Sequence, residues 1–259
     1  MYRKLWRHRD LVLSLVRRQY QLRYRQSMVG FAWAILPPLA TLGAANIVFH
    51  QVAGVQAPEG TNYSIITMAA LVPWSFFQNS LTSGVPSVVQ ASSMLTRIPF
   101  PRASLPLSMI GISMLDLSIA ALLFVVLTFL LGDGLPLTAL WFPILLGLEV
   151  LLVAGVTLLT SSLNLFARDV KLAVPIAMQL WLFLTPVMYP LESVSESLRP
   201  YYLLNPMTGL VESFRTVLIS PGAAPELDLL LPTIIGAVAL FLLGSWYFAA
   251  TENRFADVI

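Results

Sequence analysis

The sequence predicts an all-α integral membrane protein with six transmembrane helices, and three observations support this fold class. The chain of 259 residues is 57% hydrophobic and only 11% charged, whereas a soluble domain has about 25% charged residues. Its apolar residues fall in long runs, most of which reach the length of about 20 residues that a helix needs to cross a bilayer. Its basic residues lie between these runs in a strongly uneven distribution. Together these features predict a single transmembrane domain over residues 1–259.

The first expected element is an amphipathic helix over residues 10–26. Its polar face holds Asp10, Ser14, Arg17, Arg18, Gln21 and Arg25. Its apolar face holds Val12, Leu15, Val16, Tyr20 and Leu22. Such a helix lies in the membrane interface with its apolar side toward lipid. Its arginines fit three roles: anchoring to anionic headgroups, docking a cytoplasmic partner, or surrounding an anionic substrate that is attached to a lipid.

Six apolar segments follow as the expected transmembrane helices. They cover residues 30–52, 64–88, 105–131, 139–165, 172–189 and 229–250. Prolines in the first two segments predict kinks whose freed carbonyl groups need neighbouring helices. Asp116 and Glu149 lie inside the third and fourth segments, where an acidic residue suggests a functional site. Because no Lys or Arg inside the membrane is available for a proton or ion relay, we favour structural contacts for both.

Two connecting segments contain enough polar residues to act outside the bilayer. Residues 90–102, QASSMLTRIPFPR, form either a plain turn or a short helix that projects into a partner protein. Residues 190–218 begin with a polar stretch. A helix then starts at Asn205 as N-cap, with Pro206 in the first helical position. This helix carries Glu212 and Arg215, so it is too short and too charged to span. We expect it to dip into the membrane edge or to lie on it, as part of a gate.

The distribution of basic residues predicts the topology. All Lys and Arg residues except Arg199 and Arg215 fall on one side of the six expected spans. Positively charged loops remain in the cytoplasm. We therefore expect a multi-pass membrane protein with both termini in the cytoplasm.

The sequence contains few residues that could carry out chemistry. Cysteine is absent, the two histidines are far apart, and neither Lys4 nor Lys171 follows a glycine-rich phosphate loop. We therefore expect no catalytic residue, no metal site, no directly bound cofactor and no nucleic-acid partner. An intramembrane glycosyl or acyl transferase is the competing hypothesis, but it would need more than the isolated Asp116 and Glu149. Because six spans are few for a solute path, we expect a two-fold dimer.

Four segments resemble motifs of type-2 ATP-binding-cassette permeases, in particular the exporters of polysaccharide, lipopolysaccharide O-antigen or teichoic acid. Residues 23–33, RYRQSMVGFAW, together with Pro37 resemble the signature R-Y-x-x-S-x-L-G-x-x-W…P. Residues 164–170, NLFARDV, resemble N-x-F-x-R-D-[IV]. Residues 185–190 and 204–215 resemble S-P-V-x-Y-P and L-N-P-x…E-x-x-R. The chain departs from these patterns at Val29, where Leu is usual, and at Thr185, where Ser is common. The resemblance covers nearly the whole chain. It is specific for the family, but it says little about which substrate is exported.

The resemblance implies a homodimer that pairs with two copies of a separate ATPase subunit, which would bind ATP and Mg. The helix over residues 10–26 and segment 90–102 would contact that ATPase, and the coupling residues would be Thr96, Arg97, Pro99, Phe100 and Arg102. Segment 190–218 would form re-entrant gate helices on the outer side, with Asn205, Pro206, Glu212 and Arg215 at the gate.

The resemblance also implies the cargo, a glycan on an undecaprenyl-diphosphate carrier that is moved outward from the cytoplasm across the bacterial inner membrane at the expense of ATP. Membrane lipid is a further expected partner. Cations suited to a diphosphate are available at Arg17, Arg18, Arg23 and Arg25. Aromatic rings that could stack on sugars are Phe31, Trp33, Trp74, Phe76, Phe77, Trp181 and Tyr189. Aromatic residues at span ends also form an ordinary interfacial belt. Exporters of teichoic acid, drugs or small lipids within the same family remain the alternatives.

Overall fold

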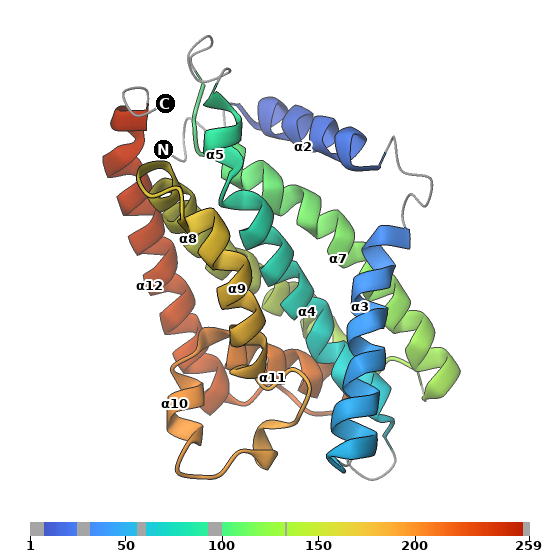
Figure 1. Cartoon of the computed structure of the whole chain (residues 1–259). Coiled ribbons are helices and arrows are strands. Elements are labelled where there is room, and N and C mark those ends of the chain that lie inside the picture. Colours follow the sequence, from blue (N-terminus) through green and yellow to red (C-terminus); the bar gives the residue numbers. More distant parts are fainter. Residues whose placement is uncertain (1–7, 25–31, 56–60, 93–99, 133, 256–259) are drawn as a thin grey trace.

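A computed structural model describes residues 8–24, 32–55, 61–92, 100–132 and 134–255, and all its regular elements are helical. Across these ranges the expectation of an all-α protein is confirmed. The elements are α2 (Arg9–Tyr24), α3 (Ala32–Ala45), η1 (Asn46–Val52), α4 (Tyr63–Gly84), α5 (Ser87–Gln90), α7 (Ser104–Leu131), η2 (Leu137–Trp141), α8 (Phe142–Phe166), α9 (Val170–Phe183), η3 (Leu191–Ser193), α10 (Arg199–Leu203), α11 (Pro206–Ile219), α12 (Leu227–Thr251) and η4 (Glu252–Arg254). The long helices form a bundle, α2 runs across one end of it, and α11 lies at the opposite end (Figure 1).

Four helical segments are long and apolar enough to cross a membrane. They are Ile35–Val52, Ser104–Leu131, Leu137–Phe166 and Leu227–Arg254. Helix α4 is 22 residues long and continues through Pro73, but polar residues in its second half make it less apolar than these four. Helix α9 has only 14 residues and ends at Phe183, short of the expected boundary at residue 189. Pro186 accounts for this early end, since proline disfavours helical geometry in the residue before it.

Helix α4 forms the centre of the bundle. It contacts α3, α7, α8, α9 and α11, and the side chains of Trp74, Phe76 and Phe77 are all at most 1% exposed. Surrounded on all sides, α4 does not need a lipid-facing apolar stripe. This explains how α4 can carry polar residues although it lies alongside the long apolar helices.

Helices α8 and α12 pack closely because glycines line their contact. A Cβ atom at Gly155 would lie 2.5 Å from the Cα atom of Phe241, and Gly244 of α12 approaches the backbone of Gly155. Small residues allow membrane helices to come close enough for extensive van der Waals contact. These two glycines therefore determine how α12 lies against the bundle.

Part of the apolar side of α2 packs on the protein, although we expected this side to face lipid, and Leu22 on the same side is 66% exposed. Leu15 is buried, and Val16 lies where a side chain at Gly111 of α7 would be. Arg17 and Arg18 are exposed on the other side of the helix. Because α7 presents a groove at its glycine, the apolar stripe of α2 has a protein surface to bury.

One end of the bundle collects most of the described basic residues. Helix α2, the start of α7, the α8–α9 turn and the end of α12 meet there (Figure 1). A separate hydrophobic cluster fixes this end, and its buried members are Val88, Ala103, Leu158, Leu165, Phe248 and Phe255. Arg199 lies at the opposite end with α10 (Figure 1). We name the first the cation-rich end and the second the α11 end.

We expect Gly155→Leu to destabilise the fold by about 1–3 kcal/mol, because the new side chain would have to displace the α12 backbone. Thermal unfolding of the purified protein in detergent should show a midpoint lowered by several degrees. Gly147→Leu is the matched control on the same helix, since a Cβ atom there meets nothing within 4 Å. Equal midpoints for the two variants would disprove the packing role of Gly155.

Candidate functional site

The N-terminal end of α11 is held in two directions by one asparagine. Asn205 Oδ1 accepts a hydrogen bond from the Met207 amide at 3.1 Å, and Pro206 follows in the first turn. This confirms the helix start expected from the Asn-Pro pair. Asn205 Nδ2 also donates to Thr185 Oγ1 at 2.9 Å, so the cap ties α11 to the turn that follows α9.

Helix α11 is buried along almost its whole length, although we expected it to lie at the membrane edge. It packs against α12, α4 and α8, and a side chain at Gly209 would collide with Leu229 and Thr233 of α12. Glu212 and Arg215 are only 6% and 8% exposed. The two charges on this helix therefore point into the protein, where each needs a partner.

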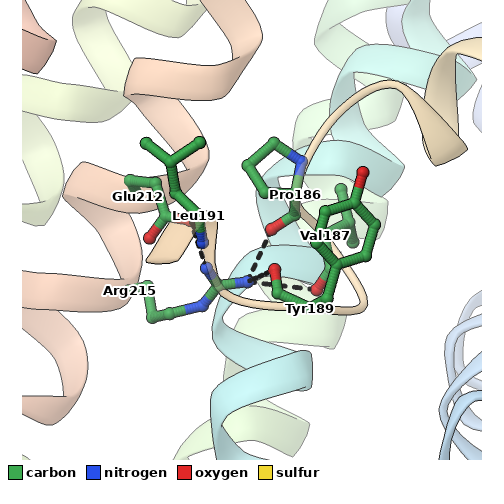
Figure 2. A network of polar contacts seen from close by, with 6 residues as sticks. All are labelled: Pro186, Val187, Tyr189, Leu191, Glu212 and Arg215. Carbon is green, nitrogen blue, oxygen red and sulfur yellow. Dashed lines mark hydrogen bonds and ion pairs between the residues drawn. The ribbon is translucent and has the colours of Figure 1, made fainter. Parts of the chain in front are cut away.

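Arg215 and Glu212 bind one another and the turn formed by residues 186–191 (Figure 2). Arg215 Nη1 donates to Glu212 Oε1 at 2.5 Å, and Nη2 donates to the carbonyls of Pro186 at 2.7 Å and Val187 at 3.2 Å. The Leu191 amide donates to Glu212 Oε1 at 3.0 Å. One ion pair thus holds both ends of this turn, which we name the outer turn.

The chemistry of the outer turn explains why an arginine is found here. Carbonyl groups outside a helix and away from water need donors, and the outer turn leaves those of Pro186 and Val187 inside the protein. The guanidinium group has several donors in a fixed plane and remains charged. Glu212 balances that charge, so the pair satisfies the turn without leaving an isolated ion.

Two tyrosines attach the outer turn to neighbouring elements. Tyr63 of α4 donates to the Met188 carbonyl at 2.6 Å, and Tyr189 donates to the Phe183 carbonyl at 2.6 Å. Burial, followed by the hydroxyl of Tyr202, raises the pKa of Tyr189. Its hydroxyl therefore keeps its proton and continues to donate at any physiological pH.

A second cluster lies at the cation-rich end. The Arg102 amide donates to Glu252 Oε1 at 3.2 Å, the Arg102 guanidinium group bonds the Glu252 carbonyl, and it lies 5.8 Å from the ring centre of Phe255. This clamp joins the start of α7 to the end of α12. Sequence reasoning selected Arg102 but missed Glu252 and Phe255, because 150 residues separate the partners and no local pattern links them.

Asn164 explains part of the NLFARDV segment. Its Nδ2 donates to the Val85 carbonyl at 3.3 Å, and its Oδ1 accepts from the Lys171 amide at 3.0 Å. The asparagine thus connects the end of α4 with the start of α9. The motif was visible in the sequence, but its partner at Val85 was not.

The remaining expected site residues are only partly described. The expected coupling residue Phe100 is half-buried beside the Arg102 clamp. The residues outside the described structure, in whole or in their side chains, are Arg23, Arg25, Phe31, Trp33, Thr96, Arg97 and Pro99.

The aromatic residues expected to line a path fall into two groups. Trp74, Phe76 and Phe77 are covered by the chain itself, because α4 is central. Trp181 and Tyr189 are half-buried, and Trp181 contacts Phe77 edge-on. The role of these aromatics stays a prediction, and burial within one chain lends Phe76 and Phe77 no support.

Comparisons with known proteins give consistent matches along the chain. Residues 10–219 match the family described as ABC-2 type transporter. The O-antigen export system permease protein RfbA of Myxococcus xanthus is 28% identical, covering 100% of this chain and 99% of its own. The protein of that name from Klebsiella pneumoniae is 26% identical over 96% and 95%. The polysialic acid transport protein KpsM of Escherichia coli is 20% identical over 83% of each chain.

We expect Arg215→Met to cost about 3–5 kcal/mol of unfolding free energy, since Glu212 would be left as a buried, unpaired charge. Arg199→Met is the control, because Arg199 also bonds two carbonyls, those of Val194 and Glu192, in a largely exposed loop. Its cost should be about 1 kcal/mol or less. Removing both charges with Glu212→Leu and Arg215→Met should restore part of the loss. Similar denaturation midpoints for Arg215→Met and Arg199→Met would refute this account.

Proposed function

Because the chain belongs to the ABC-2 type transporter family, we propose that it is the membrane-spanning subunit of an ATP-driven exporter that moves polysaccharide outward across the bacterial inner membrane. It is a multi-pass membrane protein, with four helices of spanning length. The observation that carries the proposal is the alignment of two O-antigen export system permeases along at least 96% of this chain. A transporter family also argues against the intramembrane transferase.

The proposed substrate is a glycan on an undecaprenyl-diphosphate carrier. Arg17 and Arg18 support this substrate because both are exposed at the cation-rich end, where they could bind a diphosphate. Arg23 and Arg25 belong to the same proposal by sequence alone. Exporters of teichoic acid, drugs or small lipids are less well supported, since the named relatives are an O-antigen export system and a polysialic acid transporter.

We propose six spans, adding α4 and α9 to the four longest helices. Both termini would then face the cytoplasm, because the described basic residues gather at the end where α2 and η4 lie. The segment from η3 to α11 would be re-entrant from the outer side. This proposal is supported by α11, which begins at the Asn205 cap and is then buried inside the protein. With 14 residues, it does not continue to the other end of the bundle.

The proposed assembly is a homodimer with two copies of an ATPase subunit that binds ATP and Mg. Helix α9 supports a second copy, because it buries only Val174 and Met178 and leaves Gln179 exposed in the middle of an apolar helix. An amide facing lipid alone would lack hydrogen-bond partners. A second protomer, or a wet path between two protomers, would supply them.

Contacts along the chain suggest how ATP hydrolysis would reach the outer side. The ATPase would press on α2 and on segment 90–102, of which the described residues 90–92 and 100–102 lie at the cation-rich end. The Arg102 clamp would pass that movement to α12, and α12 packs against α11 at Gly209. Arg215 of α11 holds the outer turn. A shift of α12 would therefore release or tighten the proposed gate.

The proposed function is tested by complementation. A strain that lacks its own export permease but keeps the partner ATPase should regain surface polysaccharide when this chain is expressed. Accumulation of the glycan inside the cell, with the chain correctly inserted, would refute the proposal.

We expect Arg17→Ala with Arg18→Ala to block export without preventing membrane insertion, because their charges serve the substrate or the ATPase rather than the fold. Surface glycan is the readout, and the amount of protein in the membrane fraction is the control. Arg17→Lys with Arg18→Lys should retain most export if charge alone matters. Unchanged surface glycan in the alanine variant would count against both roles.

We expect Arg102→Ala to uncouple the complex, so that ATP hydrolysis continues while export falls. The physical reason is loss of the guanidinium contacts to Glu252 and Phe255. Arg254→Ala is the matched control, since Arg254 lies two residues from Glu252 but is exposed. ATPase rate and glycan export should be measured on the same reconstituted complex. Parallel loss of both activities would exclude a coupling role.

A further inference from the structure

A polar cavity lies between α3, α4 and α7, close to the middle of each helix. Its volume is about 210 Å³, and its polar lining consists of Thr41, Trp74, Ser75, Gln78, Asn79 and Asp116. Thr41 lies halfway along α3 and η1, the α4 residues just beyond the midpoint of α4, and Asp116 near the midpoint of α7. In a bilayer-spanning bundle, the cavity is therefore near half the depth of the membrane.

Several polar groups around this cavity lack hydrogen-bond partners. Gln78 and Asn79 use only their main-chain carbonyls, which accept from Thr82 and Ser83. Within the described ranges, their side-chain amides are therefore not bonded to protein. The indole N–H of Trp74, on a side chain only 1% exposed, is also unpartnered there. Unsatisfied groups at membrane depth are costly, so this set indicates a ligand.

The combination of groups selects the class of ligand. Amides and hydroxyls provide donors and acceptors side by side, as the hydroxyl groups of a sugar ring require. Asp116 adds carboxyl oxygens to the lining. Among the described residues that line the cavity there is no Lys or Arg, the partners that an anionic diphosphate would need. A divalent cation would need several oxygen ligands of higher charge, and no group of three His, Asp or Glu residues suited to a metal occurs in the part of the chain that the structure describes.

We propose that this cavity binds one neutral, hydroxylated sugar ring of the exported glycan during its passage, an inference that rests on the proposed function. The volume is below the range of about 300–1,000 Å³ typical of drug-sized ligands, which fits one ring better than a longer chain. Leu182 of α9 completes the lining. The cavity thus borders the helix whose exposed Gln179 suggests a path between protomers.

The test uses the reconstituted complex of permease and ATPase in lipid nanodiscs, with the radiolabelled lipid-linked glycan of the host strain as the probe. Gln78→Leu with Asn79→Leu should weaken glycan retention about tenfold, the effect of losing one or two hydrogen bonds. Ser75→Phe, which fills the cavity without removing the amides, should have a similar effect. The free glycan without its lipid should compete for retention by the wild-type complex.

Thr82→Val is the matched control, because its hydroxyl bonds only carbonyls of its own helix, one turn beyond the cavity. Normal retention in this variant, with loss in the other two at unchanged basal ATPase activity, would support the assignment. Three results would overturn the cavity assignment: unchanged retention in both cavity variants, equal loss of retention in Thr82→Val, or no competition by the free glycan. In each case, export by the wild-type complex would leave the proposed function intact. A wild-type complex that neither retains nor exports glycan would refute the proposed function and the cavity assignment with it.

Discussion

The ion pair between Arg215 and Glu212 is the interaction on which the α11 end of the protein depends. A turn inside an apolar bundle cannot rely on water for its carbonyl groups. Arg215 donates hydrogen bonds to carbonyl groups of the outer turn, and Glu212 accepts one from the Leu191 amide. The shape of the outer turn, and its attachment to α11, follow from this exchange.

The same constraint organises the cation-rich end. Asn164 satisfies the Val85 carbonyl where α4 ends and the Lys171 amide where α9 begins. The Arg102 clamp similarly closes the end of α12. Each of these helix ends is therefore joined to a distant element by a polar side chain, and the apolar surfaces between them are left to pack. A bundle linked in this way can transmit a displacement from end to end, as the proposed export mechanism requires.

The sequence was sufficient for the parts of this fold that depend on local composition. The all-α class, the helix start at Asn205 and the two charges that one short apolar helix carries at Glu212 and Arg215 could be predicted from residue type and spacing. The burial of α11, the packing of α2 on α7 and the Arg102 clamp depend on contacts between residues far apart in sequence. The early end of α9 could have been anticipated from Pro186, but the apolar character of residues 184–189 concealed the turn. The polar cavity was also hidden, because Thr41, Gln78, Asn79 and Asp116 look like isolated exceptions within three apolar segments.

The shortness of α9 has a consequence for the surrounding lipid. Its 14 residues extend about 21 Å, whereas the hydrocarbon core of a bilayer is about 30 Å thick. Such hydrophobic mismatch is relieved by local thinning of the lipid or by association with another protein surface. Beside α9, a headgroup would have a shorter apolar distance to cross than elsewhere along the perimeter of the protein.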